Sequence, residues 1–245
     1  MRVVPNLYPI VGGEDAAEGA SGAHEVVVLS PAHDRSFGRL ADDEAVEALS
    51  MVRDRVRHHL GQGRAYVQAV INHGAPAGAS LDHPHAQVVA LDFVPPAIAE
   101  AVERLDRAGR DLVAAAAADA PERGLAVVTG PAMAWCPDAA STPYEVRIAH
   151  RSTRARFDEA TDAEVGVVAH STRDALGRLD AALDDPPYNL VVHTAPPGRP
   201  GFFHWYVEVQ PRLGVVAGFE LGTGLFVNVA APEDAARELR DAGTP

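Results

Sequence analysis

The feature that most constrains this chain is an internal repeat at an offset of about 120 residues. HEVVVLSPAHDRSFGRLADDEAV (24–46) aligns with YEVRIAHRSTRARFDEATDAEVG (144–166), and INHGAP (71–76) aligns with VVHTAP (191–196). After one residue of slippage, DHPHAQV (82–88) falls on FHWYVEV (203–209). Because the matches keep their order and spacing, we interpret the chain as a duplication. The predicted units are residues 1–122 and 123–245.

Each half follows the same plan of secondary structure. A strand leads to a helix that opens with acidic residues, and then come a β-branched strand, a Gly/Pro loop and a strand that carries the histidines. In chain order, these elements are predicted over 23–29, 41–60, 65–71, 74–80 and 84–91, and over 144–149, 161–179, 188–193, 194–202 and 204–210. We also expect a linking helix over 95–120, a loop over 131–143 and a terminal helix over 231–240. The plan predicts an α+β fold, in which each repeat is an antiparallel sheet with helices packed on one face.

Composition narrows the classes of function. The net charge is −13 and all 21 basic residues are arginine, which argues against nucleic acid as a partner. The single cysteine, Cys136, allows neither an intrachain disulfide nor a CxxC metal knuckle. The N-terminal apolar run is too short for a signal peptide, and no window approaches 18 uninterrupted apolar residues. We therefore expect a cytoplasmic protein with no membrane partner.

The stretch LDHPHAQVVA (81–90) is the main candidate for chemistry. Alternate residues of a strand face the same side, so His83, His85 and Gln87 should point together. The small residues of NHGAPAGAS just upstream allow backbone N–H groups to approach a phosphate. We interpret one imidazole as a nucleophile toward phosphorus, with its other nitrogen held in one tautomer. The alternative is that these histidines only satisfy hydrogen bonds within the strand, but their position behind a Gly/Ser loop favours a functional role.

The segment NHGAPAGASLDHPHAQ resembles the active-site segment of the galactose-1-phosphate uridylyltransferase family, within the histidine-triad superfamily. The shared pattern is Asn-x-Gly, then Gly-x-Ser, then His-Pro-His-x-Gln. Other blocks of this chain are similar to successive family blocks: 3–11, 24–33, 143–151, 204–213 and 217–228. The resemblance covers nearly the whole chain. The chain begins at about the block that follows the family's N-terminal cysteines, so it resembles a member shortened at the N-terminus.

The resemblance implies a double-displacement transfer of a nucleotide, with UMP as the first choice and galactose metabolism as the setting. His85 would attack the α-phosphorus of a nucleotide sugar, the sugar phosphate would leave, and a second sugar 1-phosphate would take the nucleotide. Gln87 would hydrogen-bond the phosphoryl group, and the carbonyl of residue 83 would orient the His85 ring. Tyr206 stands where the second half would need its nucleophile, so only the first half can form the covalent bond.

The resemblance also implies binding residues. A nucleotide and phosphate site would include Asn72, Gly74, Gly78 and Ser80, and Glu220 matches a position that contacts sugar hydroxyls. The arginine that binds the sugar phosphate stays open among three candidates: Arg147, Arg199 and Arg212. The implied partners are a nucleotide sugar and a sugar phosphate, and because family members are often dimers the resemblance also implies a homodimer.

A structural zinc of the family uses a CxxC pair and two histidines. His33 and His83 match these two histidines, but two ligands do not make a tetrahedral site. We expect no conventional zinc here unless a nearby group such as Asp34 or Asp82 substitutes for the cysteines.

A second family metal site uses a glutamate and three histidines. His193 and His204 match two of the histidines, whereas Tyr206 replaces the third, and Glu100 or Glu103 is the candidate acid. A hydrogen-bonded polar cluster without metal is the alternative. Zinc or iron therefore stays a candidate cofactor only at two incomplete sites.

Two other functions stay open. Histidine-triad chemistry also serves phosphorylases of dinucleoside polyphosphates and hydrolases of nucleotide conjugates, since the acceptor decides the reaction. The third hypothesis is a catalytically silent nucleotide-binding protein. The presence of His85 and Gln87 argues against it, because binding alone does not require an imidazole at that place.

Overall fold

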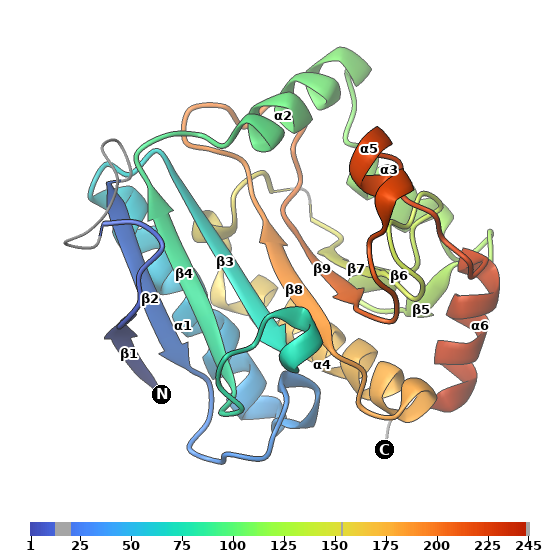
Figure 1. Ribbon diagram of the computed structural model, residues 1–245. Helices are drawn as coiled ribbons and strands as arrows, with labels where there is room; N and C mark the ends of the chain where they lie inside the picture. The colour runs from blue at the N-terminus through green and yellow to red at the C-terminus, as the bar shows by residue number, and fades with distance from the viewer. Residues whose placement is uncertain (13–20, 153, 244–245) are drawn as a thin grey trace.

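The computed structural model describes residues 1–12, 21–152 and 154–243 (Figure 1). Within these residues one antiparallel sheet contains nine strands in the order β1-β2-β4-β3-β8-β9-β7-β6-β5. The strands are β1 (Arg2–Pro5), β2 (Gly22–Val28), β3 (Tyr66–His73), β4 (His85–Leu91), β5 (Ala126–Val128), β6 (Ala132–Trp135), β7 (Val146–His150), β8 (Tyr188–His193) and β9 (Tyr206–Pro211). The α+β class and the antiparallel pairing predicted from the sequence are confirmed.

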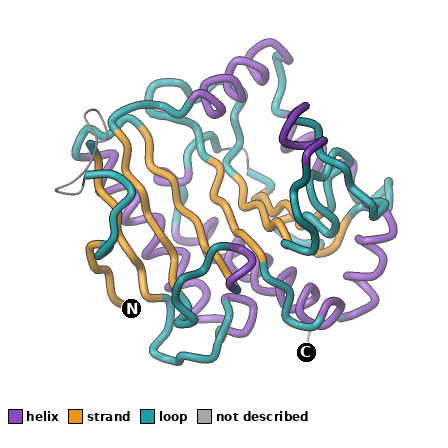
Figure 2. The backbone as a smooth tube through the Cα atoms, in the orientation of Figure 1, coloured by secondary structure: helices purple, strands orange, loops and turns teal. Residues whose placement is uncertain are grey.

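The topology follows the internal repeat. The first half contributes β2, helix α1 (Asp42–Gly61), β3 and β4, and the second half contributes β7, helix α4 (Asp162–Leu183), β8 and β9 in the same order. The two sets of strands join edge to edge where β3 pairs with β8. The sheets of the two halves are therefore continuous, as the run of adjacent strands in Figure 2 shows.

Helices α1 and α4 lie side by side on one face of this sheet (Figure 1). The third residue of each helix is a glutamate whose carboxylate accepts a hydrogen bond from the backbone N–H of the residue just before the helix, Glu44 from Ala41 and Glu164 from Thr161. The apolar faces of both helices and the helix-facing residues of the strands form one core. On β4, Ala86, Val88 and Ala90 belong to this core, so His85 and Gln87 face the other side of the sheet.

The structure corrects two predicted elements. The linking helix predicted over 95–120 is two helices, α2 (Pro96–Ala108) and α3 (Leu112–Asp119). Gly109 ends α2 with φ 62°, and Asp111 caps α3 by accepting a hydrogen bond from the N–H of Ala114. The loop predicted over 131–143 contains strand β6, which is fully buried and pairs with β7. The prolines on both sides of this segment indicated a loop, and β6 has only four residues, so little in the sequence indicated a strand.

The remaining elements lie near the C-terminus and at the far edge of the sheet. Helix α5 (Gly218–Thr223) is short, and α6 (Pro232–Ala242) packs against α4 and β5. Helix α3 contacts β6 and β7, and with them encloses a small second core on the sheet face opposite α4. Among the described residues no helix is long and apolar enough to cross a membrane.

Candidate active site

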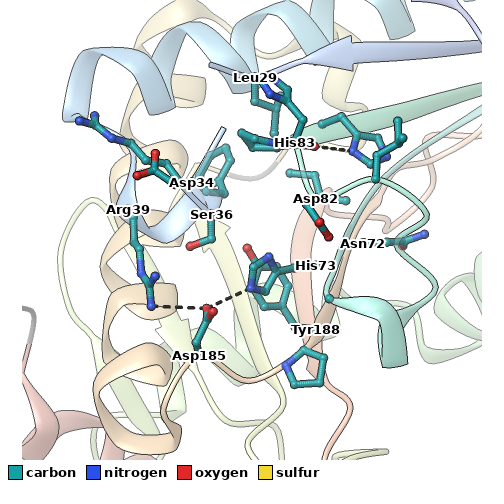
Figure 3. A pocket seen from close by; sticks show the side chains of 18 of the residues that line it. Leu29, Asp34, Ser36, Arg39, Asn72, His73, Asp82, His83, Asp185 and Tyr188 are labelled. Carbon is teal, nitrogen blue, oxygen red and sulfur yellow. Dashed lines mark hydrogen bonds and ion pairs between the residues drawn. The ribbon is translucent and has the colours of Figure 1, made fainter. Parts of the chain in front are cut away.

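A cavity of about 420 Å³ opens at the end of the sheet where β3 ends and β4 begins. Its walls come from residues 29–39, which follow β2, from the loop between β3 and β4, and from residues 185–188, which lead into β8. Figure 3 shows Arg39, His73, Asp82, Asp185 and Tyr188 around this space. Both halves of the chain therefore contribute to the cavity.

His85 is the first residue of β4 and lines the cavity, although only 6% of its surface is exposed. Its Nδ1 lies 2.9 Å from the backbone oxygen of His83. Because a carbonyl oxygen only accepts, Nδ1 must carry the proton, and Nε2 of the neutral ring then has a free lone pair. Within the described part of the chain Nε2 forms no hydrogen bond. The ring is thus held in the tautomer that a nucleophilic imidazole needs.

The loop between β3 and β4 is a tight turn made by glycine. Gly74 has φ 79° and Gly78 has φ 83°, conformations that favour glycine, and the turn is closed by a hydrogen bond from Ala77 N–H to Gly74 O of 3.0 Å. Asn72 and Gly74 line the cavity. Gly78 and Ser80 are exposed and are not among its lining residues. Of the four predicted phosphate-binding residues, the structure therefore brings two to the wall beside His85.

Gln87 lies two residues after His85, on the same face of the sheet and outside the cavity wall. Its Oε1 lies 2.8 Å from Nε2 of His24, a buried residue of β2. The backbone N–H of Ile10 donates to Nδ1 of His24 at 3.2 Å, so the proton of His24 resides on Nε2 and is donated to Gln87. Burial lowers the pKa of His24, which favours this neutral form. The oxygen of Gln87 is therefore occupied, and its NH₂ group stays available to an anion.

A charged cluster that the sequence did not indicate forms the opposite wall of the cavity. His73 Nε2 lies 3.0 Å from Asp185 Oδ1, and the His73 ring stacks on Tyr188 with centroids 4.9 Å apart (Figure 3). Arg39 contacts the same carboxylate at 3.5 Å and Asp180 at 2.6 Å. Burial opposes ionisation of Asp185, but the hydrogen bond and charge of His73 and the charge of Arg39 lower its pKa. Asp185 lies 112 residues from His73, so no local pattern could have paired them.

The first predicted metal site brings its two histidines together. His33 Nδ1 lies 2.8 Å from His83 Nδ1, and His83 Nε2 is 2.8 Å from the backbone oxygen of Ser30. Asp34 and Asp82 line the same cavity, yet no group of three or more metal-binding side chains occurs in the described ranges. The two histidines alone do not fit a tetrahedral zinc site.

The two histidines of the second predicted metal site, His193 and His204, pair with different carboxylates. His193 Nε2 pairs with Glu208 Oε2 at 3.0 Å, and its ring stacks on Tyr206 with centroids 4.5 Å apart. His204 is 1% exposed and its Nδ1 lies 3.0 Å from Asp111 Oδ2. The carboxylate beside His204 is thus Asp111 rather than Glu100 or Glu103. These residues fit a hydrogen-bonded cluster and not the predicted four-ligand site.

Of the three candidate arginines, Arg147 on β7 lies between two carboxylates, Glu145 just before β7 and Glu208 on β9. It contacts Glu145 at 3.0 Å and Glu208 at 2.9 Å. Burial and the charge of Glu208 raise the pKa of Glu145, whereas for Glu208 the His193 contact and the charge of Arg147 outweigh burial and lower its pKa to about 2. Arg147 thus compensates buried carboxylates in the second half.

The other predicted binding residues lie apart from the His85 cavity. Arg199 lies 4.0 Å from Asp106, and Arg212 donates to Asn189. Glu220 lines a separate cavity of about 70 Å³, where its carboxylate accepts from the N–H of Ala217 at 3.1 Å. The arginines in the wall of the His85 cavity are Arg35 and Arg39, which sequence reasoning missed.

Comparisons with known proteins show which proteins this chain is similar to. A family model described as a domain of unknown function (DUF4921) matches residues 21–242. ADP-glucose phosphorylase of Arabidopsis thaliana is 27% identical over 260 residues, which cover 98% of this chain and 74% of that protein. Galactose-1-phosphate uridylyltransferase of Thermotoga maritima is 29% identical over 244 residues, which cover 91% of this chain and 75% of that protein.

Solved structures show the same relationship. A uridylyltransferase structure matches with a TM-score of 0.90 and 29% identity, covering 98% of this chain and 84% of the other. The structure of ADP-glucose phosphorylase from Arabidopsis thaliana with bound ADP-glucose matches with a TM-score of 0.87 and 27% identity, covering 98% and 81%. The chain therefore belongs to the DUF4921 family, and it is a galactose-1-phosphate uridylyltransferase-like enzyme.

Proposed function

We propose that this chain transfers a nucleoside monophosphate from a nucleotide sugar to a phosphate acceptor through a covalent bond to His85. The observation that carries the proposal is the 2.9 Å contact between Nδ1 of His85, a residue of the cavity wall, and the backbone oxygen of His83, which leaves the Nε2 lone pair free. An imidazole held in this way is a suitable nucleophile toward phosphorus. The two relatives that cover most of the chain are named for reactions of nucleotide sugars or sugar phosphates.

The reaction has two displacements. Nε2 of His85 attacks the α-phosphorus, an N–P bond forms, and the P–O bond to the departing sugar 1-phosphate breaks with the electron pair on oxygen. A phosphate oxygen of the acceptor then attacks the same phosphorus and His85 leaves as the neutral imidazole. The NH₂ groups of Gln87 and Asn72 are donors for the phosphoryl oxygens, whose negative charge increases in each transition state.

Two acceptors are candidates. A sugar 1-phosphate with UMP as the transferred group is our first choice, and it corresponds to the name of the Thermotoga maritima relative. Inorganic phosphate with AMP as the transferred group is the second, and the 27% identity to the Arabidopsis thaliana phosphorylase over 98% of this chain favours it. The cavity wall carries Arg35, Arg39 and His73 as groups suited to a phosphate.

Intact-mass spectrometry of the purified protein tests the proposal. The protein is incubated with UDP-glucose or with ADP-glucose, quenched and weighed. We expect a mass increase of one nucleoside monophosphate with one of the two donors. Adding galactose 1-phosphate or inorganic phosphate should then remove the adduct, and the acceptor that removes it faster identifies the reaction.

Two variants serve as controls. His85→Ala should form no adduct while keeping the fold, and His58→Ala, an exposed histidine of α1, should form it at the wild-type level. If neither donor modifies the wild-type protein, nucleotidyl transfer is wrong and a nucleotide-binding role without turnover takes its place. If His85→Ala is still modified, the assignment of the nucleophile is wrong.

A further inference from the structure

The seam between the two halves places two asparagines opposite each other. Asn72 on β3 and Asn189 on β8 are direct partners in the antiparallel ladder. Asn72 belongs to the first half and lines the His85 cavity, whereas Asn189 belongs to the second half. Their side chains therefore connect the half without a nucleophile to the half that carries His85.

Every polar atom of the Asn189 amide has a partner from the described chain. Its Nδ2 donates to Asn72 Oδ1 and to the backbone oxygen of Ala77, each at 2.8 Å. Its Oδ1 accepts from Nε of Arg212. Because a guanidinium has only donors, the oxygen of Asn189 must face Arg212 and the NH₂ group must face the loop between β3 and β4.

This arrangement sets the orientation of Asn72. An amide can present either its oxygen or its NH₂ group to a ligand, and an oxygen would repel a phosphate. Since Asn72 Oδ1 is occupied by Asn189, the group of Asn72 that remains for a ligand is NH₂. The second bond, to Ala77 O, ties Asn189 to the glycine turn that follows Asn72. One side chain thus holds both the amide and the turn.

We infer that Asn189 is a positioning residue that makes Asn72 a hydrogen-bond donor to the phosphoryl group. The inference rests on the proposed function, since it concerns the donor groups around the phosphorus that His85 attacks. It also gives the second half a part in the chemistry, although that half carries Tyr206 where the nucleophile would be.

Single-turnover adduct formation in a double-mutant cycle tests this inference. Asn189→Ala should slow adduct formation at saturating nucleotide sugar by about 10-fold to 100-fold, as expected for losing a hydrogen bond to a charged group. Asn189→Asp keeps the size and the acceptor for Arg212 but removes both donors, so it should have a similar effect. In an Asn72→Ala background, either Asn189 substitution should change the rate less than about 3-fold.

Gln68→Ala is the matched control for a merely structural role. Gln68 donates across the same β3–β8 seam to the backbone oxygen of Val192 at 3.0 Å, and among the described residues its side chain forms no hydrogen bond with the loop between β3 and β4. Its loss should lower the melting temperature and leave the rate of adduct formation unchanged. If Gln68→Ala slows the reaction as much as Asn189→Ala, or if the Asn189 and Asn72 effects multiply, the inference is wrong.

Binding of UMP and AMP, measured by isothermal titration calorimetry, separates this inference from the proposed function. If the wild-type protein binds a monophosphate but forms no adduct, the proposed transfer reaction is wrong. The double-mutant cycle of Asn189 and Asn72 is then measured through the dissociation constant of the monophosphate. Asn189→Ala should then weaken binding less in the Asn72→Ala background than in the wild-type background. If the wild-type protein binds neither monophosphate and forms no adduct, both the inference and the proposed function are overturned.

Discussion

Replacing Arg147 by methionine should destabilise the protein strongly, because two buried carboxylates would lose their counter-charge. Glu145 is 1% exposed and Glu208 is 5% exposed, and Arg147 lies 3.0 Å and 2.9 Å from them. Removing one partner of a buried ion pair costs about 3–5 kcal/mol. Since the Arg147 side chain keeps 31% exposure, water screens part of the attraction, and we expect about 3 kcal/mol, the lower end of that range.

Urea unfolding at pH 7 measures this loss. The matched control is Arg123→Met, because Arg123 and Asp138 are each 50% exposed and such a pair contributes at most about 1 kcal/mol. Replacing both carboxylates by glutamine in the Arg147→Met background should recover most of the stability. If Arg147→Met and Arg123→Met lower the free energy of unfolding equally, the argument from buried charge is wrong.

The loss should also depend on pH. In the native protein the pKa of Glu208 is about 2, below its usual 4.5, because the interactions of His193 and Arg147 outweigh burial. A carboxyl with a depressed pKa contributes stability above the unfolded-state pKa and loses it as pH falls through the folded-state value. Without Arg147 that depression is reduced, so the difference between variant and wild type should shrink as pH falls from about 4.5 toward 2. A difference that stays constant over this range would contradict the reasoning.

Two further substitutions follow from backbone and capping geometry. Gly74→Ala should lower the free energy of unfolding by about 1–3 kcal/mol, since Gly74 has φ 79° and a Cβ there would lie 3.0 Å from Cβ of Pro187. The control in urea unfolding is Gly61→Ala, because a Cβ at Gly61 would meet nothing within 4 Å, and this substitution should be neutral or stabilising. If both substitutions lower the free energy of unfolding equally, the argument from backbone strain at Gly74 is wrong. Glu164→Gln should cost about 1 kcal/mol at pH 7 through the start of α4. The pKa of Glu164 is about 2 because hydrogen bonds from Thr161, Ser152 and Arg154 outweigh burial. The contribution of this carboxylate to stability should therefore disappear as pH falls from about 4.5 toward 2, which calorimetric unfolding over this pH range measures. If the stability of Glu164→Gln depends on pH as that of the wild type does, the reasoning is wrong.

The internal repeat made it possible to predict the order of the main helices and strands in both halves from the sequence. An offset of 120 residues aligned the segments that form α1 and α4, and it aligned Phe37 with Phe157, both of which are buried in the structure. The joining of the halves through β3 and β8 was not predictable in the same way. Pairing of two strand edges depends on which edges the rest of the fold leaves free, and each half alone carries no signal for it.

The candidate site was predictable where it is local in the sequence. Strand periodicity grouped His83 with His85, and the family resemblance of the same short segment added Asn72. His24 could have been found by the same alternation on β2, had the register with β4 been known. Asp185 and Asn189 lie more than 110 residues from their partners His73 and Asn72, so only the tertiary fold reveals them.

The division at residues 122 and 123 remains a prediction. So do the homodimer, the cytoplasmic location and the absence of nucleic acid as a partner. The roles of Gln87, Gly78, Ser80 and Glu220 are likewise predictions, and none of these four residues is in the wall of the His85 cavity.

The most direct test of the account is the site of nucleotide attachment within the protein. Wild-type protein is quenched during turnover with the donor that forms an adduct, kept at alkaline pH, and examined by ³¹P NMR and by tandem mass spectrometry of its peptides. The account predicts a phosphoramidate on Nε2 of His85, because Nδ1 is held by the backbone oxygen of His83. Attachment at Nδ1, attachment to another residue, or turnover without any phosphoramidate would contradict it.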